Sequence, residues 1–479
     1  MDASTPLHRV VVALALALLG ACGGGGGSGV APPLSPADVN LVFVVTPDVA
    51  HDPAGDVNPA TGDLNARGLQ RSVHMASFLK MAVLGGHEAA SIAALSPATH
   101  PQTGASLPFL AALGNVQQFA LLNHTTIQGT TADSFPIGTS YGPGPVPAGV
   151  APPPSYTVSC RGLDYEDPER NNLGLVTRIV DAALPGSHVF SAPWETTRAL
   201  LERLKVARGY AFEVPLAWPG PNVVLAVVVP PSGAATLRTF DSKLDPPATY
   251  PVLPRPVAGA ACNIQQHPFT TARTGGVDGA VVPPGIARNQ TVYLVRHAEA
   301  HPASSFEDGN YVGSGQWRAL ALPGFLRDRI QPDRIVSLDP AQALSDNGST
   351  FSYVRPSLTL WPYAIARGLP LELVTEFVMS ENPFDPATVE NEFDYFFRGR
   401  RFEGRSVLVA WEHLHYPPLV AALLRSYGGS ARLPDLDWPA DDYDTIWTVR
   451  FDAAGNVTVD NLLCEGIDSS QLPKTPPLF

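Results

Sequence analysis

Charged residues are scarce in this chain of 479 residues: they make up 16% of it, against 45% hydrophobic residues. That balance excludes an intrinsically disordered chain and supplies enough apolar side chains for sizeable cores. Basic residues are fewer than acidic ones: the chain has 31 Lys and Arg against 44 Asp and Glu, which gives a formal net charge of −13. A nucleic-acid-binding surface needs clustered Lys and Arg to hold phosphates, so the sequence disfavours nucleic acid as a partner.

An apolar run near the start of the chain, Val10 to Leu19, is too short to cross a bilayer as a stable helix. His8 and Arg9 precede it, in a pattern typical of an export signal. The run ends in Leu19-Gly20-Ala21-Cys22, which resembles the cleavage box of bacterial lipoproteins. The resemblance implies that Cys22 becomes the lipid-modified first residue of the mature chain, anchored to a membrane surface outside the cytoplasm. An ordinary secretory signal with a chance cysteine is the alternative.

We therefore expect a signal peptide over residues 1–22, a Gly- and Pro-rich tether over 23–38, and a location in the bacterial cell envelope. The other cysteines, Cys160, Cys262 and Cys464, form no CxxC pair and no metal-ligand spacing, so no metal site is predicted. In an oxidising compartment we favour a Cys160–Cys262 disulfide, because both residues lie in the first half of the mature chain. Sequence alone does not fix the connectivity, and Cys464 is equally well explained as a buried thiol.

The length favours two domains, and apolar runs alternate with segments of helical periodicity, which predicts an α/β architecture. In the first half we expect strands at 40–46, 89–96 and 222–229, helices at 64–82, 173–183 and 196–206, a helix followed by a strand within 107–122, and Pro-rich connections at 138–154 and 246–257. In the second half we expect strands at 291–295, 334–338, 406–410, 443–451 and 456–460, and helices at 316–329, 354–367 and 419–426.

The boundary between the two expected domains lies near residue 287, giving a divergent α/β domain over 39–287 and a second domain over 288–479. The two share an order of parts, seen by comparing NLVFVVTPDVAHDPAGD with TVYLVRHAEAHPASSFEDG. One interpretation is an old duplication, in which the first copy carries Thr46-Pro47-Asp48 where the second carries Arg296-His297-Ala298. The other is that α/β proteins resemble one another at this level of detail.

The strand expected at 291–295 leads directly into Arg296-His297-Ala298-Glu299. This string resembles the signature of the histidine phosphatase superfamily, whose fold is a three-layer α/β/α domain. The resemblance implies that His297 lies at the carboxyl end of a central strand, where ligands of open α/β sheets bind. It covers roughly two-fifths of the chain, from Thr291 to the end.

Two further residues match the same pattern. Arg355 follows the strand at 334–338 and begins the next expected helix, where the family has a second phosphate-binding arginine. His413 follows the strand at 406–410, where the family brings a second histidine; the alternative is that His413 is structural and His415 takes that place.

The chemistry of these side chains supports the same roles. The guanidinium groups of Arg296 and Arg355 present fixed N–H donors to phosphoryl oxygens and stay charged, and His413 adds another donor. His297 must instead keep one ring nitrogen unprotonated to attack phosphorus, with the other nitrogen held by a backbone carbonyl. No metal or other cofactor is required, because the guanidinium groups stabilise the charge.

The leaving oxygen needs a proton donor, and the sequence offers two candidates. Glu376 follows the helix of Arg355 and its next strand, where one branch of the family has an acidic donor. Glu412 adjoins His413 and is the rival, although it could also serve only to orient a histidine. Asn310 and Glu412 are expected to contact the substrate. Asn310 and Arg318 are weaker candidates for phosphate contact than the two arginines above, because an arginine on a helix, such as Arg318, is often simply solvated.

The sequence thus predicts an extracytoplasmic, lipid-anchored phosphatase that hydrolyses phosphomonoesters of small molecules through a phosphohistidine at His297. The alternative is a binding or scaffold lipoprotein that keeps the fold without turnover. The complete set of Arg296, His297, Arg355 and His413 favours the enzyme, because a decayed site should have lost at least one of them.

Overall fold

The computed structural model of the chain describes residues 31–97, 102, 105, 107–123, 173–262, 268–300, 309–340, 343–346, 349–374 and 382–479. Residues 32–479 form one compact unit. The predicted roles of Cys22, Cys160 and Glu376, and the Pro-rich connection expected at 138–154, lie outside the described residues. Within the described ranges, no helix has both the length and the apolar character needed to span a membrane.

The structure is mixed α/β, as predicted, and its first large sheet has the strand order β4-β5-β1-β6-β7. The central strand β1 (Val39–Thr46) is buried along its whole length. It pairs in parallel with β5 (Gly186–Pro193) and antiparallel with β6 (Val223–Val229). The edges are β4 (Ala89–Ala94), parallel to β5, and β7 (Thr236–Asp241), antiparallel to β6.

The second large sheet has seven strands in the order β13-β10-β14-β9-β15-β16-β8. Its central strand β9 (Gln290–Arg296) lies between the parallel strand β14 (Ser406–Trp411) and the antiparallel strand β15 (Thr445–Phe451). The remaining strands are β10 (Arg334–Leu338), β13 (Leu371–Val374), β16 (Val457–Cys464) and β8 (Thr270–Arg273). Two small two-stranded sheets are formed by β2 (Val57–Asn58) with β3 (Asp63–Leu64) and by β11 (Ala343–Asp346) with β12 (Ser349–Ser352).

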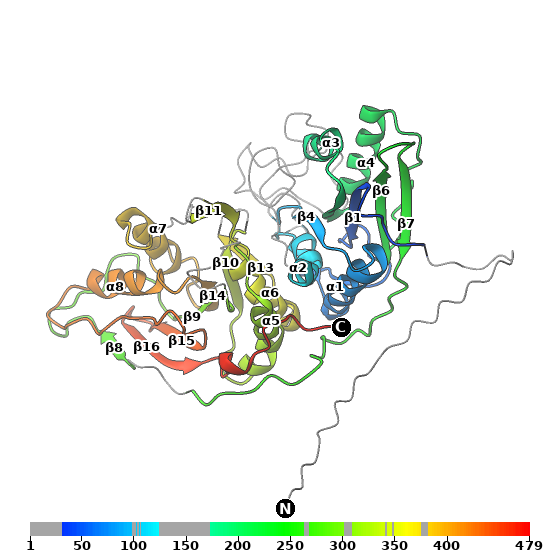
Figure 1. Ribbon diagram of the computed structural model, residues 1–479. Helices are drawn as coiled ribbons and strands as arrows, with labels where there is room; N and C mark the ends of the chain where they lie inside the picture. Colours follow the sequence, from blue (N-terminus) through cyan, green and yellow to red (C-terminus); the bar gives the residue numbers. More distant parts are fainter. Residues whose placement is uncertain are drawn as a thin grey trace, which may run out of the picture. The chain divides into compact units, whose positions relative to one another are not determined.

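The helices occur as packed pairs. Around the first sheet they are α1 (Ala66–Phe78), which continues as a π-helical turn over Leu79–Val83, α2 (Ala111–Asn123), α3 (Leu173–Asp181) and α4 (Trp194–Arg208). Around the second sheet they are α5 (Gly313–Leu326), α6 (Arg355–Arg367), α7 (Pro386–Phe396) and α8 (Tyr416–Ser426), and a short 3-10 turn follows at Ser469–Gln471. Helix α5 packs on α6 and α7 packs on α8, and the two pairs lie on opposite sides of the seven-stranded sheet (Figure 1).

Local sequence explains why α6 starts and stops where it does. Pro356 lies in its first turn, where the missing N–H would have no helical partner and the fixed φ suits the helix. The helix ends at Gly368, which adopts the left-handed conformation with φ of 63°. These two residues therefore define the ends of the helix and make Arg355 its first residue.

Most expected elements are confirmed to within a few residues, but the helix followed by a strand at 107–122 is wrong. A single helix, α2, runs through Ala111–Asn123. Most of its residues are buried, on several sides rather than along one stripe, so its apolar pattern lacks the clear helical period that marks an amphipathic helix. Strand β5, which the sequence analysis did not identify, mixes Ser and His with apolar residues and fits neither simple pattern.

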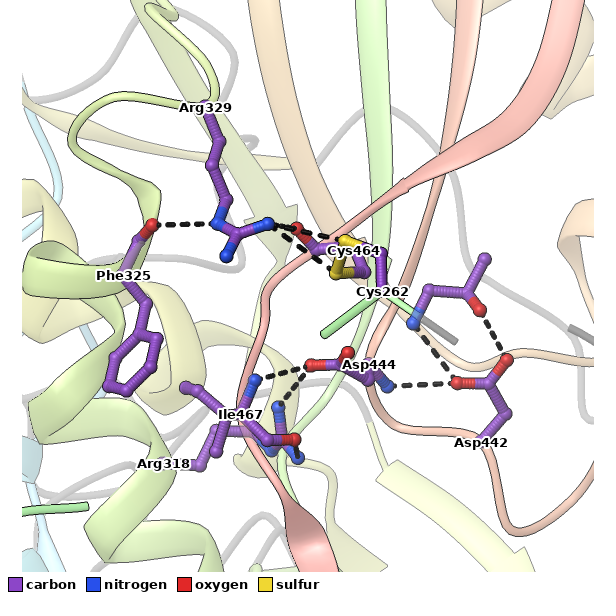
Figure 2. The surroundings of a disulfide bond; sticks show 9 residues. Cys262, Arg318, Phe325, Arg329, Asp442, Asp444, Cys464 and Ile467 are labelled. Atoms are coloured by element: carbon purple, nitrogen blue, oxygen red, sulfur yellow. Dashed lines mark hydrogen bonds and ion pairs between the residues drawn. A yellow bond between two sulfur atoms is a disulfide. The ribbon is translucent and has the colours of Figure 1, made fainter. Parts of the chain in front are cut away.

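The predicted Cys160–Cys262 disulfide is also wrong, because Cys262 is bonded to Cys464. The backbone before Cys262 runs beside the segment that follows β16: Ala260 N donates to the carbonyl of Gly466 over 2.8 Å. Arg329 lies beside both sulfurs, with its Nη1 3.2 Å from Cys262 Sγ (Figure 2). The segment that contains Cys262 thus lies beside the second sheet, although it belongs to the first half of the sequence. Its position in the sequence therefore did not predict its disulfide partner.

Removing this disulfide should lower the stability of the protein. The bond closes a loop with a sequence separation of 202 residues, and loss of a native disulfide typically costs about 2–5 kcal/mol. We expect reductant to lower the Tm of the wild type but not that of the double variant Cys262→Ser, Cys464→Ser. Peptide mapping without reduction should yield the 262–464 pair. A Cys160–Cys262 peptide in its place would contradict the assignment.

Candidate active site

The strands β9 and β14 bring two predicted histidine-bearing segments together. The strands are parallel neighbours, so their carboxyl ends meet at one edge of the sheet, where ligands of open α/β sheets bind. His297 directly follows β9, and His413 follows β14 by two residues. The backbone N–H of His297 donates to the carbonyl of Trp411 over 2.9 Å, which ties the two strand ends together.

The ring of His297 is buried and its tautomer is fixed. Nδ1 lies 2.7 Å from the carbonyl oxygen of Ala298, and since a carbonyl can only accept, Nδ1 must carry the proton. Burial lowers the pKa of His297 well below its usual value, and the neighbouring charges of Arg355 and Arg296 lower it further, with His413 adding to the effect. His297 is therefore a neutral imidazole with its lone pair on Nε2.

Arg296, the last residue of β9, is held from two directions. Its guanidinium carbon lies 3.9 Å from the ring centroid of Tyr443, a cation–π contact that fixes the plane of the fork. Its Nη1 donates to the carbonyl of Ala440 over 2.5 Å. The Tyr443 ring also makes an edge contact with His297, with the centroids 6.1 Å apart.

Arg355 reaches the site from the first residue of α6 and is buried. Burial lowers the pKa of its guanidinium to about 10, so the group remains charged at neutral pH. Its guanidinium carbon lies 4.9 Å from the ring centroid of Tyr353, which in turn makes an edge contact with His297 at 6.0 Å. Thr359 links the loop after β9 to α6: its hydroxyl accepts from Ala298 N over 2.8 Å and donates to the Arg355 carbonyl, one turn earlier in the helix, over 2.7 Å.

Glu412 contacts the Nδ1 of its neighbour His413. Burial raises the pKa of Glu412, but the contact with His413, the hydrogen bond from the backbone N–H of Leu414 and the charge of Arg296 together outweigh burial and leave the pKa lowered. A carboxylate that stays ionised is a poor proton donor at neutral pH, so the geometry suits Glu412 to orienting His413.

The alternative second histidine, His415, has a different place. Its ring stacks on Trp411 at 4.3 Å, and its Nδ1 lies 3.0 Å from the buried carboxylate of Glu392. This is a satisfied core histidine. His413 is the one whose charge acts on His297.

Arg318 is neither a phosphate ligand nor a solvated helix residue, which corrects the expectation for it. Its side chain is fully buried and donates to Glu299 over 2.8 Å and to Glu465 over 2.5 Å, with Asp444 at 3.6 Å (Figure 2 shows Arg318 and Asp444). Burial would lower the pKa of Arg318, but these carboxylates outweigh it and raise the pKa. Glu299 lies two residues after His297, so the ion-pair cluster fixes the loop that carries the histidine.

Asn310 lies at the start of the α5 segment and is buried. Its Oδ1 accepts from the backbone N–H of Tyr311 over 2.9 Å and from Gln117 Nε2 over 2.8 Å. The preceding residue, Gly309, accepts from the backbone N–H of Arg355 over 3.0 Å, which places Asn310 beside the start of α6. Glu376, the first candidate for proton donor, lies outside the described residues.

Three residues that hold the charged groups in place were not predicted from the sequence: Tyr353, Tyr443 and Thr359. Tyr353 lies two residues before Arg355, so its closeness in the sequence could have indicated a contact between the two side chains. Tyr443 comes from a loop 147 positions after Arg296 (443 minus 296), and no local pattern connects the two.

The arrangement can bind and attack an anion. The charges of Arg355, Arg296 and His413 all act on the buried, neutral ring of His297, and burial strengthens each charge–charge interaction. Among the described residues, no group of three or more His, Cys, Asp and Glu side chains could hold a metal ion.

No family model and no curated protein matches the chain. Solved structures match part of it. The protein histidine phosphatase SixA, solved with tungstate, is 19% identical; the match covers 36% of this chain and 97% of that protein, with a TM-score of 0.24. A mycobacterial glucosyl-3-phosphoglycerate phosphatase with inorganic phosphate is 17% identical, with 33% and 88% covered and a TM-score of 0.21. The alpha-ribazole phosphatase from Shigella flexneri is 15% identical, with 37% and 98% covered and a TM-score of 0.21. At these scores the likeness carries no weight for function, which rests on the geometry of the site.

Proposed function

We propose that the protein is a phosphatase that hydrolyses phosphomonoesters through a phosphohistidine on His297. The observation that carries the proposal is the state of His297: Nδ1 donates to the Ala298 carbonyl, the pKa is lowered, and Arg296 and Arg355 lie close by. A neutral imidazole beside two permanent cations is the combination that phosphoryl transfer to histidine requires.

The reaction would proceed in two displacements. In the first, the lone pair of His297 Nε2 forms a bond to phosphorus, the bond from phosphorus to the ester oxygen breaks, and the leaving oxygen takes a proton from a general acid. In the second, water forms a bond to phosphorus and loses a proton to the same group. The Nε2–phosphorus bond then breaks, releasing inorganic phosphate. The donors of Arg296, Arg355 and His413 would bind the equatorial oxygens throughout, with Asn310 as a further contact.

The general acid of this scheme is assigned to Glu376, on the sequence argument alone. Glu412 is better suited to holding His413, since its carboxylate is kept ionised by His413 and Arg296. With these donors in place the mechanism needs no metal ion or organic cofactor.

We further propose that residues 39–287 form a degenerate copy of the catalytic domain at 288–479. The strand order β4-β5-β1-β6-β7 and its directions recur as β10-β14-β9-β15-β16. Gly68 and Arg71 occupy the third and sixth positions of α1, as Gly315 and Arg318 do in α5. Arg71 donates to Asp56 over 2.6 Å, the counterpart of the Arg318–Glu299 pair.

In this comparison the first copy lacks the nucleophile. Glu299 comes three residues after the end of β9, whereas Asp56 comes ten residues after the end of β1 (299 minus 296; 56 minus 46). The intervening segment, which begins Pro47-Asp48, replaces the histidine. The first copy is therefore proposed to be non-catalytic.

The lipoprotein-like start leads us to propose that Cys22 anchors the chain to the cell envelope, so the substrates would be extracytoplasmic phosphomonoesters of small molecules. The competing hypothesis is a scaffold lipoprotein that keeps the fold and binds phosphorylated molecules without turnover. The buried, tautomer-fixed His297 favours the enzyme, since a scaffold gains nothing from an activated nucleophile.

Replacing the nucleophile should abolish turnover. We expect the wild type to release phosphate from a generic aryl phosphate, and His297→Ala to lower kcat on the order of 10³-fold or more, because the covalent route is lost. His87→Ala, at an exposed histidine of the first half, is the matched control and should keep wild-type activity. EDTA should not inhibit. Undiminished turnover in His297→Ala would remove His297 as nucleophile, whereas tungstate binding without any wild-type turnover would favour the scaffold.

The lowered pKa of His297 predicts how stability depends on pH. An unfolded histidine takes up a proton near pH ~6.5, while folded His297 does so only at lower pH. Its contribution to stability is present above pH ~6.5 and is lost as the pH falls toward the folded pKa. Between pH 7 and pH 5 the wild type should therefore lose more Tm than His297→Asn, measured side by side. Equal losses in the two proteins would show that His297 titrates normally.

A further inference from the structure

Two buried hydrogen bonds join the halves of the chain in a reciprocal way. Trp361, the seventh residue of α6, donates from Nε1 to Asp63 Oδ2 over 3.0 Å. Gln117, the seventh residue of α2, donates from Nε2 to Asn310 Oδ1 over 2.8 Å. Asp63 lies two residues before the N-cap of α1, Asn65, and Asn310 lies two residues before the N-cap of α5, Val312. Equivalent positions of the two halves thus contact each other in both directions, as they do across a two-fold symmetric dimer interface.

At this interface the ring of Trp361, from α6, packs directly against the backbone of α2. A Cβ atom on Gly114 of α2 would lie 2.1 Å from the ring of Trp361, so no other residue fits there unless the helices move. Burial raises the pKa of Asp63 to about 6, and its partner in the second half, Trp361, is a neutral donor. The interface is therefore a packed, buried contact, so a shift of α2 would move the Trp361 side chain of α6.

Gln117 acts on the part of the active site that α6 begins. The oxygen of Asn310 accepts both Gln117 Nε2 and the backbone N–H of Tyr311, which fixes the amide plane and its orientation. The carbonyl of Gly309, the preceding residue, accepts the backbone N–H groups of Val354 and Arg355, each over 3.0 Å. A hydrogen bond from the first half thus holds the segment against which the first residue of α6 is placed.

We propose that Gln117 is a positioning residue for the catalytic site, and that the first half serves the second as a built-in, non-catalytic partner subunit. The proposal rests on the proposed phosphatase function, because it assigns Asn310 and Arg355 to the phosphoryl group. Gln117 touches no substrate. It fixes the amide of Asn310 and, through Gly309, the start of α6, so both groups meet the phosphoryl oxygens already oriented.

The expected effect on KM and kcat depends on whether these contacts are made in the ground state, in the transition state or in both. Asn310 and Arg355 bind the phosphoryl group in the ground state as well as in the transition state. Loss of their alignment therefore weakens binding of both states, which raises KM more than it lowers kcat. A residue that only stabilised the fold would lower Tm without this split.

The test compares two neighbouring glutamines of α2. Gln117 and Gln118 are each 2% exposed and each donates from Nε2 to the second half, but Gln118 donates to the carbonyl of Pro477 in the C-terminal tail. In Gln117→Met we expect KM for an aryl phosphate and Kd for tungstate to rise about tenfold, the order expected when a buried hydrogen bond that orients a binding group is lost. Gln118→Met is the matched control, for which both constants should stay within about twofold of wild type.

The outcomes separate this inference from the proposed function. A wild type that neither hydrolyses aryl phosphates nor binds tungstate would overturn both. A wild type that does so, together with equal constants for Gln117→Met and Gln118→Met, would overturn the positioning role alone. If Gln117→Met does not fold, Gln117→Asn keeps the amide but withdraws it by one methylene, and it should raise Kd for tungstate in the same way; wild-type affinity in that variant would contradict the proposal.

Discussion

One hydrogen bond, from Nδ1 of His297 to the carbonyl of Ala298, fixes the chemical state of the candidate site. In water, a histidine flanked by two arginines would still protonate at moderately low pH, but here burial and the charges of Arg355 and Arg296 both oppose protonation. The carbonyl decides which nitrogen keeps the single proton. Together these effects leave the lone pair on Nε2. The same arginines that would bind the phosphoryl group also disfavour protonation of this nitrogen.

That bond holds only because the loop after β9 is fixed by groups from several elements. Thr359 of α6 binds Ala298 N, and the buried side chain of Arg318 binds Glu299 from α5. Glu465, which directly follows β16, and Asp444, in the loop before β15, extend this cluster. Burial raises the pKa of Glu465 to about 8 despite the charge of Arg318. The cost of burying the charge of Arg318 is thus offset by neighbouring carboxylates rather than by solvent, in a cluster that fixes the loop after β9.

The residues of the candidate site are easier to recognise in the sequence than the residues that hold them in place. Arg296, His297, Arg355 and His413 each follow or begin an element that local pattern reveals, and parallel strands bring such ends together. The Arg296–Tyr443 contact, the Cys262–Cys464 bond and the Gln117–Asn310 bond join positions far apart in the chain, and no local pattern contains them. Helix α2 was misread because most of its residues are buried, on several sides, so periodicity could not distinguish it from a strand.

The most direct test of the central claim is the protonation state of His297 itself. In protein labelled with ¹⁵N-histidine, the chemical shifts assigned by comparison with His297→Asn should report a neutral ring with the proton on Nδ1 and a bare Nε2 at pH 6. A doubly protonated ring at that pH, or a proton on Nε2, would contradict the account, because the nitrogen that must attack phosphorus would then have no lone pair to offer.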